Sequence, residues 1–293
     1  MKIFYRISDK SYDKSKLIGA TKEVCLMNFC KAFAGVVFEG FDPSDKSYVP
    51  PMRIIADNCE RKTIKMLNKT GLPVTLTSEG NAGSFRKAFE MALEEDDNEF
   101  VYFCEDDYLH LGSAPDLLKE GIKRSDYVTL YDHPDKYTRY YNGGEFSKVI
   151  KTASSHWRYT LSTCMTFGAK VKTLREDKDI WLDDELTGKD HPHDHFIFTK
   201  IAEKNRRVAV CIPGVACHVD MTFSGTVNYM LMEQWAIDMM VDELSNELDD
   251  IQAKLPQEEK AKWRNMRGSL LFEKTGQGRL LALDALRHQI KKT

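Results

Sequence analysis

The sequence predicts an α/β protein in which a mixed sheet is flanked by helices and followed by a helical appendage. Over the first two thirds of the chain, short β-rich runs alternate with segments of helical periodicity, as in stacked βαβ units. Two of the apolar runs end directly in polar residues, at Asp57 and at Glu105. After Gly225 only helical periodicity continues. We therefore expect an α/β domain at residues 1–225 and a C-terminal helical extension at residues 226–293.

The strands are predicted from short runs rich in β-branched and aromatic residues. The run at residues 100–104 is apolar throughout, which is typical of a strand buried on both faces of a sheet. The predicted strands span residues 1–7, 52–56, 74–76, 100–104, 127–131, 148–152, 160–167 and 208–211.

The helices are predicted from apolar residues at helical spacing and from residues that begin or end helices. Gly71 follows one such segment, where glycine commonly ends a helix. Ser113 precedes another, where a serine can cap the first turn. The predicted helices of the domain span residues 21–33, 60–68, 81–94, a segment from 115, and 194–204. Those of the extension span residues 228–251, a segment from 256, and 279–291.

The composition is that of an ordinary globular protein. Of 293 residues, 42% are apolar and 30% are charged, which excludes a disordered chain. No apolar run approaches the roughly 18 residues of a membrane span, and the strand-like N-terminus predicts no signal peptide. The seven cysteines form no CxxC pair, so we expect reduced thiols in a cytoplasmic protein. The net charge of −3 provides no overall attraction to nucleic acid.

Charge is unevenly distributed near the C-terminus. Residues 254–293 carry ten Lys/Arg against four Asp/Glu. This excess belongs either to a solvated helical face or to a surface that meets an anionic acceptor or a membrane. The apolar helical faces must be buried against the α/β domain, against one another or in a homo-oligomer. The candidate phosphate contacts are Lys262, Arg264, Arg267, Arg279, Arg287, Lys291 and Lys292.

Three adjacent carboxylates, Glu105, Asp106 and Asp107, follow the apolar strand at 100–104. Ligands of open α/β sheets bind outside the carboxyl ends of the strands. Three acids buried there would repel one another, and a hard divalent cation would relieve that cost. The alternative is a solvated acidic turn.

Two further polar segments are expected at the same sheet edge. Asp57 and Asn58 end a strand, where they either cap the following helix or contact a nucleobase or ribose. The segment from Gly80 to Arg86 places backbone N–H groups, Asn81 and one cation at a helix N-terminus, which can bind an anion. It lacks the Gly-Lys-Ser/Thr ending of a P-loop.

The order and spacing of these motifs over residues 1–225 resemble GT-A nucleotide-sugar glycosyltransferases, most of all the inverting family-2-like members. Glu105-Asp106-Asp107 stands where that family carries an Asp-x-Asp motif, although the first acid is Glu here. The segment at 193–202 is similar to the family's Glu-Asp-x-Asp helix, with His193 in place of the Glu. The segment at 212–218 resembles one that ends in a metal- or diphosphate-binding His. The chain also resembles, more loosely, transferases encoded by tailed bacteriophages.

The resemblance implies roles for single residues. Asp107 and His218 would bind Mn²⁺ or Mg²⁺, and Asp194 would be the catalytic base, with Asp183 or Asp184 as the alternative. Glu105 and Asp106 would contact the ribose or lie behind the metal ligands. The full predicted donor-binding set is Arg6, Asp57, Asn58, Asn81, Arg86, Glu105 and Asp106.

His191, His193 and His195 alternate near Asp194. A zinc site is one interpretation, and the other is that one histidine orients Asp194 while the others are structural or contact the acceptor. Trp157, Tyr159 and Trp181 are either core residues or stacking surfaces for an acceptor.

The implied function is a metal-dependent inverting glycosyltransferase that uses a UDP-sugar. Its acceptor would be a glycan, a lipid-linked saccharide or a hydroxymethylated base in phage DNA. A nucleotidyltransferase is the first alternative, although Ser8-Asp9-Lys10-Ser11 lacks the glycine expected in its phosphate-binding loop. A non-catalytic sugar-binding or assembly protein with a degenerate transferase fold is the second.

Overall fold

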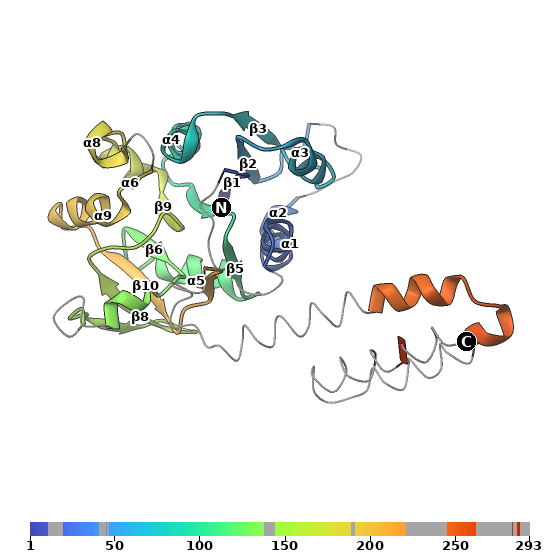
Figure 1. Ribbon diagram of the computed structural model, residues 1–293. Helices are drawn as coiled ribbons and strands as arrows, with labels where there is room; N and C mark the ends of the chain where they lie inside the picture. The colour runs from blue at the N-terminus through green and yellow to red at the C-terminus, as the bar shows by residue number, and fades with distance from the viewer. Residues whose placement is uncertain are drawn as a thin grey trace. The chain divides into compact units, whose positions relative to one another are not determined.

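The computed structural model describes residues 1–10, 20–40, 45, 47–137, 144–188, 191–220, 245–261, 283, 286 and 287. The chain divides into two compact units, Met1–Val227 and Asn228–Thr293, which Figure 1 colours along the sequence. The predicted domain boundary at residues 225 and 226 lies outside the described residues.

The described strands of the first unit form one large mixed sheet and one small sheet. They are β1 Lys2–Ser8, β2 Met52–Asp57, β3 Val74–Thr77, β4 Phe100–Glu105, β5 Tyr108–His110, β6 Tyr127–Thr129, β7 Val149–Lys151, β8 His156–Thr160, β9 Phe167–Lys170, β10 Val208–Ile212 and β11 Ala216–His218. Within the described residues, the nine-stranded sheet has the order β3-β2-β1-β4-β9-β6-β10-β8-β7, and β5 pairs with β11 in the small sheet. β1 runs parallel to both β2 and β4, whereas β9 is antiparallel to β4. The predicted mixed α/β sheet flanked by helices is confirmed.

The described helices of the first unit are α1 Lys22–Ala32, α2 Ala34–Val37, α3 Arg61–Asn68, α4 Gly80–Ala92, α5 Ala114–Gly121, the 3₁₀ helix η1 Pro134–Tyr137, α6 Val171–Glu176, α7 Lys178–Trp181, α8 Asp184–Thr187 and α9 Asp194–Glu203. Side chains cap two of the described α-helices, α1 and α8. The Thr21 side chain accepts a hydrogen bond from the Val24 N–H and so caps α1. Gly71, with φ +70°, follows α3 in the left-handed region that favours glycine, as predicted.

Side chains from alternate positions of the central strands enter two hydrophobic clusters, one on each face of the sheet. Tyr5 and Tyr102 belong to the cluster that also contains residues of α1, α2 and α5. Phe4 and Phe103 belong to the cluster that contains residues of α4, α6, α7 and α9. Burial on both faces explains why these strands are nearly continuous apolar runs in the sequence.

Two of the three aromatic residues considered as stacking surfaces belong to the core. Trp157 and Trp181 are fully buried. The Trp181 ring stacks on Phe167 with 4.8 Å between ring centroids. Tyr159 is half-buried and donates to the Arg124 carbonyl at 3.0 Å. The core interpretation is therefore confirmed for both tryptophans.

The predicted strand at 160–167 is wrong. β8 ends at Thr160 and β9 begins at Phe167, and the segment between them crosses from one part of the sheet to another. Ser162, Thr163 and Thr166 are buried there. The Thr129 hydroxyl donates to the Thr166 carbonyl at 2.9 Å. This segment has the β-prone composition of a strand, but its backbone bonds to side chains instead of to a neighbouring strand.

The segment from Gly80 to Ser84 forms the start of α4, close to the predicted helix start at residue 81. The Asp57 Oδ1 atom accepts hydrogen bonds from the backbone N–H groups of Glu79, at 2.7 Å, and Gly80, at 3.2 Å. An internal carboxylate thus lies at the helix N-terminus where the sequence predicts an anion-binding site.

The second unit is helical where it is described, at residues 245–253 and 257–261 and at Leu283, Leu286 and Arg287. Leu248, Leu283 and Leu286 are buried, and Arg287 pairs with Glu247 at 3.0 Å. The other six candidate phosphate contacts lie outside the described residues. No helix in the described part of the chain is long and apolar enough to cross a membrane.

Candidate active site

The candidate site lies at the carboxyl edge of the three central parallel strands. Ser8 is in register with Asp57, and Arg6 with Glu105. The acids Asp106 and Asp107 follow β4 directly. The topology therefore brings to one edge the polar residues that end three strands, as ligand sites of α/β sheets require.

Glu105 is held by a buried arginine. The Arg6 Nη2 atom donates to Glu105 Oε1 at 2.8 Å, and its Nη1 atom donates to the Asn81 carbonyl and side-chain oxygens at 2.8 and 2.9 Å. The pKa of Glu105 is raised to about 7, mainly by burial and also by the charges of Asp107 and Asp194, whereas the charge of Arg6 opposes the shift. Three members of the predicted donor-binding set thus contact one another.

Asp106 is held by a lysine that the sequence analysis did not identify. Its Oδ2 atom accepts hydrogen bonds from the Lys22 ammonium at 2.6 Å and from the Ser8 N–H at 2.9 Å. The Lys22 ammonium also donates to the Ser8 carbonyl. Burial raises the pKa of Asp106, and the Lys22 charge opposes that shift. Lys22 and Asp106 are 84 residues apart, so no local pattern signals the pair.

The two predicted metal ligands, Asp107 and His218, lie in direct contact. The His218 Nε2 and Asp107 Oδ2 atoms are 3.1 Å apart. The β5–β11 pairing places His218 opposite Tyr108, and the Val219 N–H donates to the Asp107 carbonyl at 2.8 Å. The small sheet therefore holds the histidine against the last acid of the triplet.

A carboxylate and an imidazole are both ligand types that divalent cations accept, although the 3.1 Å separation here is that of a histidine–carboxylate hydrogen bond. Both side chains also retain some exposure. Among the described residues, no group of three or more His, Cys, Asp and Glu is arranged to hold a metal ion. The remaining ligands of such a cation would be phosphate oxygens or water.

Asp57 and Asn58 contact each other and the start of α4. The Asp57 carboxylate accepts from the Thr77 hydroxyl at 2.9 Å and from the Asn58 amide at 2.8 Å, besides the two backbone N–H groups of α4. Asn58 adopts a positive φ of 49°. These contacts show that Asp57 stabilises the N-terminus of α4. Its contact with a nucleotide stays a prediction.

The Arg86 side chain contacts residues in and next to α8. Its guanidinium contacts Asp184 and also donates to the Thr187 hydroxyl at 3.2 Å. Asp183 caps α8, because its Oδ1 atom accepts from the Glu185 N–H at 2.8 Å. The two alternative bases therefore take part in contacts within and around α8.

Asp194 is the first residue of α9 and is half-buried. Its Oδ1 atom accepts from the His195 N–H at 2.7 Å. Burial raises the pKa of Asp194, whereas this hydrogen bond and the charges of His133, His195 and Lys136 lower it. Because Asp194 in turn raises the pKa of Glu105, the two carboxylates are within electrostatic reach.

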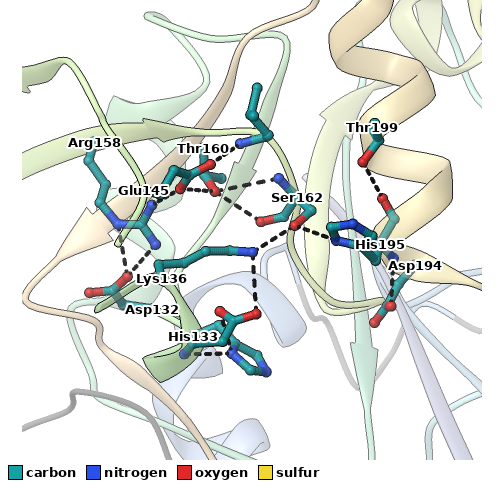
Figure 2. Close-up of polar contacts among 12 residues, drawn as sticks. Asp132, His133, Lys136, Glu145, Arg158, Thr160, Ser162, Asp194, His195 and Thr199 are labelled. Carbon is teal, nitrogen blue, oxygen red and sulfur yellow. Dashed lines mark hydrogen bonds and ion pairs between the residues drawn. The ribbon is translucent and has the colours of Figure 1, made fainter. Parts of the chain in front are cut away.

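A buried polar network, which the sequence analysis missed, lies beside Asp194 (Figure 2). The Arg158 guanidinium donates to Asp132 at 2.7 Å and to Glu145 at 2.7 Å. The Lys136 ammonium donates to the Ser162 hydroxyl at 2.7 Å. The only local signals are scattered charged residues between Asp132 and Ser162, which resemble those of any exposed loop.

No protein-family model matches the sequence, and no curated protein matches it. Among solved structures, TarS from S. aureus is 16% identical, with a TM-score of 0.38, over 98% of this chain and 83% of that chain. CMP:2-keto-3-deoxy-manno-octonic acid synthetase in complex with CTP is 10% identical, with a TM-score of 0.42, over 73% and 93% of the two chains. Mannose-1-phosphate geranyltransferase from Thermus thermophilus is 13% identical, with a TM-score of 0.41, over 72% and 74%. These scores are too low to bear on the reaction of this chain.

Proposed function

We propose that the first unit is a metal-dependent inverting glycosyltransferase that moves a sugar from a UDP-sugar to a hydroxyl acceptor. The observation that carries the proposal is the contact between Asp107 and His218 at 3.1 Å, within a sheet edge that also presents Glu105 and Asp106. A carboxylate and an imidazole side by side are ligand types for a cation that also takes phosphate oxygens.

Different residues of the chain would bind the metal, position the acids and accept the proton. Asp107 and His218 would hold Mn²⁺ or Mg²⁺, which when bound supplies positive charge to a leaving diphosphate. Arg6 and Lys22 hold Glu105 and Asp106 in place beside this pair. Asp194 accepts the proton of the acceptor hydroxyl, a role for which its raised pKa is suited because a base works best when its pKa approaches the operating pH.

We propose the cytoplasm as the location and a glycan, a lipid-linked saccharide or a hydroxymethylated DNA base as the acceptor. The seven cysteines are scattered along the sequence and include no CxxC pair, which supports a reducing compartment. A role of the C-terminal helices in acceptor binding or in a homo-oligomer stays a proposal, since most of them lie outside the described residues.

The test is release of UDP by the full chain from a panel of UDP-sugars, with Mn²⁺, with Mg²⁺ and with a chelator. Metal-dependent release that requires an acceptor supports the proposal. Pyrophosphate release from a nucleoside triphosphate and a sugar phosphate would instead identify a nucleotidyltransferase. Nucleotide-sugar binding without turnover of any donor would identify a non-catalytic binding protein.

A further inference from the structure

Strand β7 lies at one edge of the large sheet, where large apolar side chains are exposed. It is the last strand in the sheet order and, among the described strands, pairs only with β8. Val149 of β7 is 57% exposed, and Phe146, three residues earlier, is fully exposed. Leu161, which directly follows β8, is 61% exposed. Single exposed apolar residues are ordinary, but several on adjoining segments indicate a surface that meets a partner.

Backbone contacts hold these apolar residues on adjoining segments. The Glu145 carboxylate accepts a hydrogen bond from the Leu161 N–H at 2.6 Å (Figure 2). The Tyr159 N–H donates to the Lys148 carbonyl at 3.1 Å. The segment from Glu145 to Lys148, which contains Phe146, therefore runs alongside the end of β8 and the residue that follows it.

Cations surround the same edge. Lys148 and Lys151 are exposed on the segment of Val149, and Arg124 and Arg207 are exposed beside Tyr159. The Tyr159 hydroxyl donates to the Arg124 carbonyl at 3.0 Å, and the Arg207 guanidinium carbon lies 6.0 Å from the centroid of the Tyr159 ring. Four cations from separate segments thus gather around the exposed apolar residues.

The carboxylates of this region have other partners. Glu145 pairs with the buried Arg158 at 2.7 Å, and Asp126 pairs with Arg206 at 3.8 Å. Glu120 accepts hydrogen bonds from the turn after β7. Within the described part of the chain, the four exposed cations form no ion pair with a carboxylate. Their charge is therefore available to an anionic partner.

We propose that the β7 edge, defined by Phe146, Lys148, Val149, Lys151 and Leu161, docks on the surface of an anionic lipid bilayer. The apolar side chains enter the boundary between the headgroups and the acyl chains, and the lysines contact lipid phosphates. Arg124 and Arg207 extend the positive surface beside this edge.

A bilayer suits both properties of this edge, whereas other partners suit only one. A second copy of the chain that paired with β7 would bring Lys148 and Lys151 of both copies together, and lysines on an edge strand oppose such pairing. A nucleic acid would bind the cations but leave Val149 and Leu161 in water. An anionic membrane surface binds the cations and also removes the apolar side chains from water.

The docking surface goes beyond the proposed function and does not depend on it. Leu161 precedes Ser162, whose Oγ atom lies 3.2 Å from the His195 Nδ1 atom in the first turn of α9. The β7 edge thus adjoins the helix that begins with Asp194. A bilayer at this edge would favour a lipid-linked saccharide among the three proposed acceptors.

The first experiment measures sedimentation of the full chain with lipid vesicles. One set of vesicles contains only phosphatidylcholine, and the other also contains phosphatidylglycerol, an anionic lipid. We expect the chain to sediment with the anionic vesicles, less with the neutral ones, and less again as added salt screens the attraction. No binding of the wild type to the anionic vesicles, or equal binding to both kinds, overturns the proposal.

Variants at exposed positions locate the binding surface. Lys148→Gln/Lys151→Gln is expected to weaken binding to anionic vesicles by about 10–30-fold, since each cation near such a surface contributes about fivefold. Phe146→Ser is expected to weaken it by about 5–20-fold, because an apolar ring no longer leaves water on binding. Phe146→Trp should bind as the wild type does, because tryptophan is favoured at membrane interfaces.

Matched controls make the same kinds of change elsewhere. Lys170→Gln/Lys178→Gln alters the net charge equally at exposed lysines of β9 and α7. Leu76→Ser removes a side chain that is 61% exposed on β3, the strand at the other edge of the sheet. We expect both controls to bind as the wild type does. Wild-type affinity in the lysine variant or in Phe146→Ser, or equal losses in the controls, overturns docking through this edge.

The two proposals fail in different ways. A chain that binds anionic vesicles through the β7 edge but transfers no sugar disproves only the proposed function. A chain that transfers sugar but does not sediment with anionic vesicles disproves only the docking surface.

Discussion

The Arg6 guanidinium and the Glu105 carboxylate pair across two neighbouring parallel strands, with 2.8 Å between Nη2 and Oε1. The same guanidinium binds the Asn81 carbonyl at the start of α4. One buried cation therefore connects the end of β4 to the first turn of a helix 24 residues earlier in the chain. This connection sets the position of the acidic segment that follows β4.

Arg6→Met is expected to lower the free energy of unfolding by about 2–3 kcal/mol, because it leaves the carboxylate of Glu105 in a largely buried place without its cation. The value is below that of a fully buried pair because Glu105 keeps 25% exposure. Urea unfolding of the two proteins measures the difference.

The double variant Arg6→Met/Glu105→Gln should recover part of that loss, because it removes the unpaired charge. Lys200→Met, which breaks the exposed pair of Lys200 with Glu203, serves as the control and should change stability by less than about 1 kcal/mol. An Arg6→Met variant as stable as the wild type would show that the pair contributes nothing.

Asp107→Ala is expected to weaken binding of UDP in the presence of Mn²⁺ by at least about tenfold, because it removes a charged oxygen ligand from a hard cation. Binding measured without metal should be unaffected. Isothermal titration calorimetry measures both. Asp116→Ala, at an exposed acid of α5, is the control. Equal affinity of Asp107→Ala and wild type in Mn²⁺ would remove Asp107 from the metal site.

Asp194→Asn is expected to leave donor binding intact and to lower kcat by about 10²–10⁴-fold, because only the proton acceptor is lost. Steady-state kinetics with a saturating donor measure the change. Asp184→Asn is the matched control, since Asp184 is 90% exposed and pairs with Arg86. Loss of turnover in the control but not in Asp194→Asn would transfer the role of base to the segment at α8.

The strands at the centre of the sheet could be predicted from the sequence because burial on both faces leaves apolar runs, as at residues 100–104. β5 and β11 were missed, because each spans only three residues, whereas the equally short β6 and β7 lie within longer β-rich runs. The segment at 160–167 was assigned wrongly because Ser and Thr there have strand-like composition but bond to side chains. Composition does not distinguish a strand from an irregular segment whose backbone bonds to side chains.

The site could be predicted where polar residues directly follow a strand, and where the family resemblance points to a distant residue such as His218. The acids that end β4 lie where a strand end must present them, and the structure brings His218 to Asp107. Lys22 and Lys136 could not be found from the sequence, because their partners Asp106 and Ser162 lie 84 and 26 residues away. Only the tertiary fold creates those contacts.

Asp57→Ala is expected to lower the free energy of unfolding by about 1–3 kcal/mol, because the Thr77 hydroxyl and the first N–H groups of α4 lose their acceptor. Nucleotide affinity should change little if the carboxylate is wholly engaged in this cap. Thermal unfolding and UDP titration are measured on the same samples. A stable variant that no longer binds UDP would instead assign Asp57 to the nucleotide.

The free energy of unfolding depends on pH partly through His110, which lies in the core. It is 3% exposed, and its Nε2 atom lies 2.8 Å from the Tyr102 hydroxyl. The rings of Phe29 and Phe33 meet it edge-on, with 5.2 and 5.5 Å between centroids. Burial lowers the pKa of His110 to about 3, since the charged form would lose its hydration among these rings.

Below about pH 6.5 the unfolded chain binds a proton at His110 that the folded chain does not bind until about pH 3. Stability therefore falls as the pH falls through this window, by about 2 kcal/mol between pH 7 and pH 5 from this residue alone. His110→Gln keeps a hydrogen-bonding group for Tyr102 but does not titrate, so its unfolding free energy should decline less over the same range. Urea unfolding at pH 7 and pH 5 measures the two slopes, with the exposed His156→Gln as the control that keeps the wild-type slope. Identical slopes for His110→Gln and wild type would show that His110 is protonated in the folded chain as readily as in the unfolded one.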